Sequence, residues 1–138
     1  MILGVGVDLL HLPRLRSLLN RRDPLRLAGR ICSAAELEQW QDMHSSGQGA
    51  ESERFLASRW AAKEAAYKAL YPTFRPTWKN LEIRKVDKKP FLSFSPAFKP
   101  QSAEHAPTST ELEDVKMHLS MTHDADLLIA YVVAEKAS

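Results

Sequence analysis

The sequence contains a single cysteine, Cys32, and no long apolar run. One thiol excludes an internal disulfide framework and is typical of a reducing compartment. No apolar run approaches the roughly 20 residues that a helix needs to span a bilayer, so we expect no membrane partner. A zinc site is not favoured either, because Cys32 has no second thiol beside it and His118 and His123 form the one close histidine pair.

The chain also lacks a large excess of either charge. Its net charge of +2 is too small to argue from totals for a nucleic-acid or membrane partner. The hydrophobic content of 44% and the charged content of 26% are those of an ordinary globular protein. Its 138 residues predict one domain over residues 1–138. Strand-like sequence begins at Ile2, so we expect no presequence.

The small net charge hides a segregation of charges along the chain. Six arginines and one acid lie between Arg14 and Arg30, whereas residues 31–53 carry acids and no Lys or Arg. The basic stretch is either a solvated face or a docking surface for an acidic partner. It contains no aromatic residue on which a base could stack, which makes a nucleic-acid partner the weaker interpretation.

Residues 2–10 are predicted to form a buried strand, because they are rich in branched apolar side chains. Side chains alternate along a strand, so Gly4, Gly6 and Asp8 share one face. Two glycines there indicate that another group approaches the backbone closely. Asp8 is either a turn or capping residue at the strand end or a functional acid.

Residues 55–71 are predicted to form a long helix that ends at Pro72, since they contain neither glycine nor proline. Apolar residues lie nearly all round this helix, which is typical of a buried central helix. Glu64 and Lys68 stand four residues apart on one face. They form either an ordinary helical ion pair, worth about a few tenths of a kcal/mol, or part of a site. The alanines around them favour a site.

Asp8 and Glu64 therefore both carry a carboxylate inside an apolar element. Ionised carboxylates are rarely buried without a partner, because desolvation of a charge is costly. Two such groups indicate a hard cation such as Mg²⁺, which takes one or two carboxylates and keeps its other positions for water and phosphates. The lysines next to Glu64, Lys63 and Lys68, indicate the phosphates.

The remaining sequence predicts further helices and an antiparallel sheet. A helix is expected from Pro13, and a capping box at Ser33 and Glu36 predicts another over residues 34–43. Residues 44–52 are predicted to be a flexible loop, and residues 96–114 a flexible insertion. The expected strands lie on either side of a turn at 87–90 and of a connection at 123–126, within residues 81–94, 116–122 and 127–133. His123 is either a residue that bonds within this connection or part of a site. The predicted fold class is α+β, an antiparallel sheet packed against a long central helix.

Several segments together make the chain resemble the holo-acyl-carrier-protein synthases, the small 4′-phosphopantetheinyl transferases. The most specific are the strand Gly4-Val5-Gly6-Val7-Asp8 and the W-x-x-K-E-x-x-x-K pattern from Trp60 to Lys68. The segment 30–36, the Lys89-Pro90 turn and the segment 120–124 follow in the same order. The resemblance covers the chain except the loop near residue 48 and the insertion, and it implies a 4′-phosphopantetheinyl transferase-like fold.

The resemblance implies transfer of the phosphopantetheine arm of coenzyme A to a serine of an apo-acyl carrier protein, with release of adenosine 3′,5′-bisphosphate. Asp8 and Glu64 match the family's metal ligands for Mg²⁺, and with Lys68 they match its catalytic residues. The base that takes the proton of the serine is left open between a metal-bound water, Asp8, Glu64 and Lys68.

The same resemblance implies the binding residues and the assembly. Arg59, Lys63, Lys68 and His123 match coenzyme A-binding positions, and Arg14 matches an arginine that contacts the acidic carrier protein. Short members of the family are usually trimers with a site shared between subunits, so a homotrimer is expected.

Three features depart from the family pattern, and one of them is Tyr67, which stands where a smaller residue is common. His11 stands where an acid is common, and residues 70–76 stand where a glycine-containing loop is common. The insertion and the segment 71–78 favour a eukaryotic, fungal-type member, in which case the protein would be intracellular and either mitochondrial or cytoplasmic.

The alternative to an enzyme is a non-catalytic module that binds an acidic protein through its arginine-rich first helix.

Overall fold

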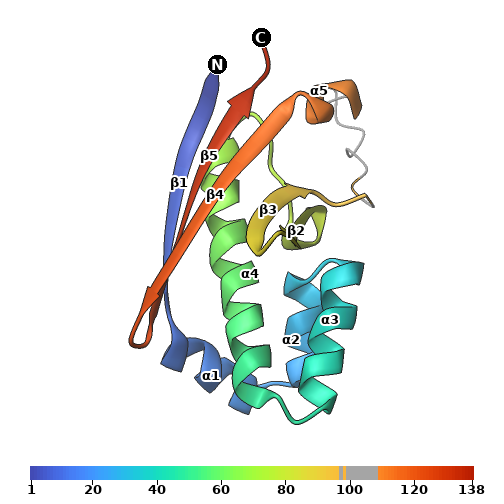
Figure 1. Ribbon diagram of the computed structural model, residues 1–138, viewed down its shortest axis with the longest axis vertical. Coiled ribbons are helices and arrows are strands. Elements are labelled where there is room, and N and C mark those ends of the chain that lie inside the picture. The colour runs from blue at the N-terminus through green and yellow to red at the C-terminus, as the bar shows by residue number, and fades with distance from the viewer. Residues whose placement is uncertain (97, 99–108) are drawn as a thin grey trace.

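A computed structural model describes residues 1–96, 98 and 109–138 of the chain. Its centre is a five-stranded antiparallel sheet with strand order β1-β5-β4-β3-β2, packed against the long helix α4 (Figure 1). The strands are β1 (Ile2–His11), β2 (Leu81–Val86), β3 (Lys89–Phe94), β4 (Val115–Asp124) and β5 (Leu127–Lys136). The predicted α+β fold is confirmed.

Three helices, α1 (Leu12–Arg21), α2 (Pro24–Ile31) and α3 (Ala34–Ser45), cover the first half of α4 (Gly49–Leu70), at the lower end of the molecule in Figure 1. Pro13 lies in the first turn of α1, as predicted. The capping box of α3 is also confirmed, because the Ser33 and Glu36 side chains each accept a hydrogen bond from the other residue's backbone N–H. Helix α2 was not expected.

The predicted flexible loop at residues 44–52 is wrong. Helix α3 continues to Ser45 and α4 begins at Gly49, so only residues 46–48 connect the two helices. The Ser46 hydroxyl donates to the Asp42 carbonyl at 2.6 Å, and the Ser52 hydroxyl donates to the Gly49 carbonyl at 2.9 Å. These serines bond to backbone groups at the helix ends, which is a common alternative to a role in a loop.

The two hairpins turn more tightly than the sequence predicts. Asp87 and Lys88 alone join β2 to β3, both with positive φ, which suits a two-residue hairpin. Residues 125 and 126 join β4 to β5, so the predicted connection 123–126 is wrong at its first two positions. His123 belongs to β4, where it lies opposite Leu128 of β5.

The predicted flexible insertion at residues 96–114 lies largely outside the described residues. The described part includes a short helix, α5 (Ser109–Glu113), just before β4. Within the part of the chain that the structure describes, no helix combines the length and hydropathy that a membrane span requires.

The contact between β1 and α4 has almost no space between the two backbones. A Cβ atom built on Gly6 would lie 1.9 Å from the Ala65 carbonyl oxygen, and one on Gly4 would lie 2.2 Å from that of Ala69. The facing residues of α4 are alanines that are completely buried. The close approach predicted from the two glycines is confirmed, and the approaching group is the backbone of the central helix.

This contact predicts that Gly6→Ala destabilises the fold. The added methyl group has to push α4 away from β1, and such overpacking costs up to about 3 kcal/mol of unfolding free energy. Urea denaturation measures the change. The matched control is Gly29→Ala in α2, where a Cβ meets nothing within 4 Å, and there we expect no destabilisation. Equal effects of the two substitutions would contradict this packing.

Candidate active site

Asp8 lies on the face of β1 that packs on α4, two residues beyond Gly6 along the strand. The Nζ atom of Lys68 lies 3.4 Å from Asp8 Oδ1 and donates a hydrogen bond of 2.8 Å to the carbonyl of Val7. The Lys68 side chain is half exposed, so this ion pair is screened by water and contributes little stability. The pair therefore lies at the surface, where a phosphate can reach it.

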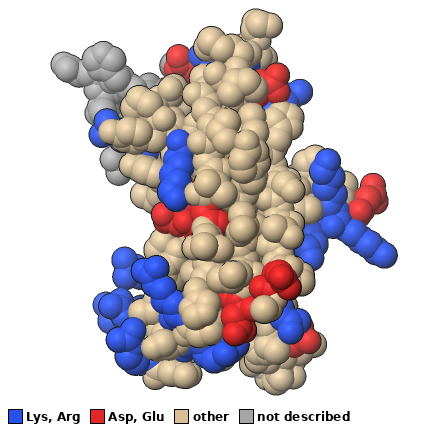
Figure 2. Space-filling view, turned by 90° about the vertical axis from the view of Figure 1, so that its left-hand side faces the viewer, with Lys and Arg blue, Asp and Glu red and all other residues tan. Residues whose placement is uncertain are grey.

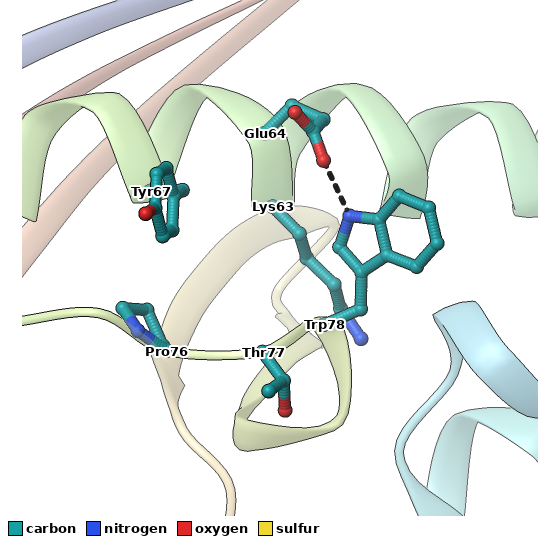
Figure 3. Close-up of a pocket in the computed structure, with 6 residues that line it drawn as sticks. All are labelled: Lys63, Glu64, Tyr67, Pro76, Thr77 and Trp78. Carbon is teal, nitrogen blue, oxygen red and sulfur yellow. Dashed lines mark hydrogen bonds between the residues drawn. The ribbon is translucent and has the colours of Figure 1, made fainter.

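Glu64 lies one helical turn before Lys68 on α4. Its Oε1 atom accepts a hydrogen bond of 2.7 Å from the indole Nε1 of Trp78, as Figure 3 shows. Lys68 bonds to the β1 backbone and pairs with Asp8, so the two residues do not form the ordinary helical ion pair that was the alternative interpretation of their spacing. The packing of β1 on α4 brings Asp8, Glu64 and Lys68 to the same region.

The donor set of Asp8 and Glu64 fits a magnesium ion. Both carboxylates are partly exposed, and they come from two elements that pack directly on each other. Among the described residues, no group of three or more His, Cys, Asp or Glu side chains could hold a metal. Two carboxylate ligands, with water and phosphate oxygens at the other positions, are what Mg²⁺ accepts, whereas zinc sites typically have three or four protein ligands that include His or Cys.

A pocket of about 330 Å³ opens beside Glu64, between α4 and the segment that follows it (Figure 3). The segment ends in a short 3₁₀ helix, η1 (Trp78–Asn80), where the Asn80 side chain accepts hydrogen bonds from the Thr77 backbone and hydroxyl. The pocket is lined by Lys63, Glu64, Tyr67, Pro76, Thr77 and Trp78.

Lys63 has the largest fully buried side chain of α4. Its side chain is completely buried and points away from Glu64 (Figure 3). Its Nζ donates to the carbonyl of Ile31 at 2.7 Å and to the carboxylate of Glu36. Burial lowers the pKa of Lys63, and the adjacent Glu36 partly opposes that effect. The predicted contact of Lys63 with coenzyme A stays a prediction, and in this structure its Nζ is directed at Glu36.

Arg59 belongs to the same buried group. Its Nε lies 3.6 Å from Glu36 Oε2, and its guanidinium stacks 3.6 Å above the ring centre of Phe55. Burial lowers the pKa of Arg59, again opposed by Glu36. The predicted contact of Arg59 with coenzyme A stays a prediction, and in this structure the side chain is directed at Glu36.

Glu36 is the centre of this buried group, and only the capping box pointed to it in the sequence. Its side chain also accepts a 3.0 Å hydrogen bond from the backbone N–H of Ile83 in β2, so it joins α3, α4 and the sheet. The neighbouring Cys32 is buried, and burial raises the pKa of its thiol to about 12. Cys32 is therefore a protonated core residue and not a nucleophile.

His123 and Arg14 are both exposed, and neither is among the residues to which Asp8 and Glu64 are bonded. His123 is exposed near the end of β4, and no contact among the described residues joins it to Asp8, Glu64 or Lys68. Arg14 is exposed on α1, whose first backbone N–H, that of Leu12, donates to the carbonyl of Asp126 at the β4–β5 turn. Any role of His123 and Arg14 therefore depends on a bound molecule or a second chain.

The arginine-rich stretch forms a basic surface at one end of the molecule. Arg22, Arg26 and Arg30 line a hollow of about 500 Å³ together with Asp23 and Leu27. Arg16 is instead paired with Glu53 of α4 through two hydrogen bonds of 2.8 and 3.2 Å. Figure 2 shows Lys and Arg side chains gathered at the end of the molecule where α1 and α2 lie.

Comparisons with known proteins agree on one family. Residues 4–132 match the model of the 4′-phosphopantetheinyl transferase superfamily. The holo-[acyl-carrier-protein] synthase of Polaromonas sp. is 34% identical over 99% of this chain and 98% of its own length. That of Bacillus subtilis is 31% identical over 100% of this chain and 99% of its own.

Solved structures agree as well. The holo-[acyl-carrier-protein] synthase of Neisseria meningitidis has a TM-score of 0.77 and 32% identity, over 99% of this chain and all of that one. A holo-(acyl-carrier-protein) synthase of Bacillus anthracis, solved in complex with CoA (3′,5′-ADP), has a TM-score of 0.70 and 26% identity, over 99% of both chains.

The chain therefore belongs to the 4′-phosphopantetheinyl transferase superfamily, and within it to the holo-[acyl-carrier-protein] synthases. The resemblance inferred from Asp8 and the Trp60 to Lys68 pattern is confirmed, as is the prediction of an enzyme. The relatives named above are bacterial, so the expected fungal, mitochondrial-type membership has no support.

Proposed function

We propose that this protein transfers the 4′-phosphopantetheine arm of coenzyme A to a serine of an apo-acyl carrier protein. The observation that carries the proposal is the assembly of Asp8, Glu64 and Lys68 where β1 packs on α4, beside a pocket that opens to solvent. The names of the relatives and the coenzyme complex from B. anthracis support the two substrates.

In this reaction the serine hydroxyl gives up its proton to a base, its oxygen forms a bond to the phosphorus next to the pantetheine arm, and the bond from that phosphorus to the bridging oxygen breaks. Adenosine 3′,5′-bisphosphate leaves. Asp8 and Glu64 would hold a magnesium ion, which polarises phosphoryl oxygens and offsets the charge that develops on them. Lys68 adds a positive charge beside Asp8, and its bond to the Val7 carbonyl fixes its direction.

Intact-mass analysis of an apo-acyl carrier protein tests the proposal. After incubation with this protein, coenzyme A and Mg²⁺, the carrier is expected to gain the mass of one phosphopantetheine arm. A carrier whose acceptor serine is replaced by alanine is the control, and it should gain none. If several carriers stay unmodified and the protein binds no coenzyme A, the proposed activity is refuted and a non-catalytic binding module takes its place.

The basic surface fits an acidic carrier protein. Arg22, Arg26 and Arg30 line one hollow, so together they can present several positive charges to one acidic helix, and Arg14 is exposed on α1, which contacts α2. Charge complementarity of this kind speeds association and fixes orientation. We place the carrier on this surface, with its serine directed toward Asp8 and Glu64.

We also propose that the protein acts as a homotrimer in the cytoplasm, as the bacterial relatives suggest for the compartment. Support for assembly comes from the sheet face that turns away from α4, which is broadly uncharged in Figure 2. Apolar patches of this kind mark interaction sites. Its large exposed apolar residues are Ile2, Val5, Val7 and Leu9 of β1 and Leu127, Ile129 and Tyr131 of β5.

The proposed assembly predicts that Val5→Asp yields monomers. A charge at this position would be buried unpaired between subunits, which is strongly unfavourable. The matched control is Val86→Asp on β2, because Val86 is exposed to a similar extent, 54% against 50%, at the other edge of the sheet. Light scattering after size-exclusion chromatography gives the mass. A wild-type protein that elutes as a monomer at micromolar concentration refutes the trimer.

A further inference from the structure

The hydrogen bond between Trp78 and Glu64 is held in place from two sides. The Trp78 ring packs on Trp60 of α4, with ring centres 5.6 Å apart and an angle of 54° between planes. Its backbone begins η1, which the Thr77–Asn80 hydrogen bonds fix. The indole therefore has little freedom, and its N–H is directed at Glu64 Oε1 (Figure 3).

We propose that Trp78 is a positioning residue for Glu64 as a metal ligand. The indole N–H occupies Oε1, fixes the rotamer of the carboxylate and leaves Oε2 as the oxygen for the cation. This inference rests on the proposed function, in which Asp8 and Glu64 hold magnesium. Partners that orient metal ligands in this way typically contribute about 10-fold to 100-fold in metal affinity or activity.

The chemistry of the donor supports this role. An indole N–H donates and cannot accept or titrate, so it orients the carboxylate at every working pH without neutralising it. Lys68, one turn away, would form an ion pair with Glu64 and compete with the cation for its charge. Lys68 bonds to the Val7 carbonyl and pairs with Asp8, so it forms no ion pair with Glu64.

The test compares Trp78→Phe with Trp60→Phe in the full-length protein. Both substitutions remove an indole N–H and keep an aromatic ring, but only Trp78 donates to Glu64. Binding of Mn²⁺ in the presence of coenzyme A, measured by electron paramagnetic resonance, reports metal affinity without any turnover. We expect Trp78→Phe to weaken Mn²⁺ binding about tenfold. It should raise the Mg²⁺ concentration that gives half-maximal transfer by the same factor. Trp60→Phe should stay within about twofold of wild type, because the orienting bond remains.

Tighter Mn²⁺ binding by Trp78→Phe would show that the indole competes with the metal for Glu64, and would overturn the proposal. Equal effects of both substitutions would reduce Trp78 to a packing residue and overturn it as well. If wild-type protein shows neither transfer nor metal binding, the proposed function fails instead. Those three results are distinguishable in one series of measurements.

A second measurement keeps the test valid if Trp78→Phe does not fold. The wild-type protein has three indole N–H groups, those of Trp40, Trp60 and Trp78. The spectrum of a ¹⁵N-labelled Trp60→Phe variant lacks one of the three indole signals, which helps to assign the other two. We expect the Trp78 indole signal to shift on titration with Mg²⁺ and coenzyme A, whereas that of the buried Trp40 stays constant. A Trp78 signal that does not respond contradicts the proposal.

Discussion

Asp8→Ala is expected to lower the rate of phosphopantetheine transfer by at least about a hundredfold while the protein stays folded. In the proposed site Asp8 would provide one of the two carboxylates for the cation, and Glu64 alone would bind it weakly. The ion pair of Asp8 with Lys68 is partly exposed, so its loss costs little stability. The rate is measured by the mass of the modified carrier, and the fold by circular dichroism and thermal unfolding.

Asp42→Ala is the matched control for this experiment, because Asp42 is an exposed acid on α3, an element that carries no group of the proposed site. We expect it to retain full activity. If Asp8→Ala is folded and transfers the arm at the wild-type rate, then Asp8 is not a metal ligand and the proposed role of the β1–α4 contact is wrong.

Glu36→Gln is expected to destabilise the fold by about 3–5 kcal/mol, the usual effect of removing one partner from a buried ion pair. Glu36 and Lys63 are both almost completely buried, and Arg59 lies beside them. The substitution preserves the size of the side chain but leaves two buried cations without a counter-charge. Urea denaturation measures the loss of unfolding free energy.

Glu38→Gln makes the same chemical change two residues later in α3, at an exposed position, and should alter stability by less than about 0.5 kcal/mol. A second check adds Lys63→Met to the Glu36→Gln variant. The added substitution removes one uncompensated charge and should restore part of the lost unfolding free energy. A single Glu36→Gln variant as stable as Glu38→Gln would contradict the buried network.

The pH dependence of the Glu36→Gln variant follows from Lys63. Burial lowers the pKa of Lys63 in the folded protein below its ordinary value of 10.5, and loss of Glu36 lowers it further. Between the lowered pKa and 10.5 the unfolded chain binds more protons than the folded one, so unfolding becomes less favourable as pH rises. The destabilisation should therefore shrink from pH 7 toward pH 10.

The elements that the sequence predicts well are those set by local chemistry. The Ser33–Glu36 capping box, the glycines of β1 and the stop at Pro72 each depend on a few neighbouring residues, and each is confirmed. The loop at residues 44–52 was mispredicted because serine and glycine are typical of loops and of helix ends alike. Only the backbone partners of Ser46 and Ser52 distinguish the two cases.

The buried network and the tryptophan contact depend on tertiary structure. Lys63 precedes Glu64 directly, but adjacent helical residues do not face each other. Lys63 therefore pairs with Glu36, a residue 27 positions away in the chain, while Glu64 bonds to Trp78, 14 positions away. No periodicity or spacing connects those residues before α3 and η1 are placed against α4. The candidate acids could be named from the sequence, but their partners could not.

In the proposed mechanism Asp8 and Glu64 form one divalent-cation site on which transfer depends. Equilibrium titration of the protein with Mn²⁺ in the presence of coenzyme A, followed by electron paramagnetic resonance, tests it most directly. We predict one bound ion per chain in the wild type, displaced by Mg²⁺, and none in Asp8→Ala or Glu64→Ala. Wild-type stoichiometry and affinity in a folded Asp8→Ala variant would contradict the claim.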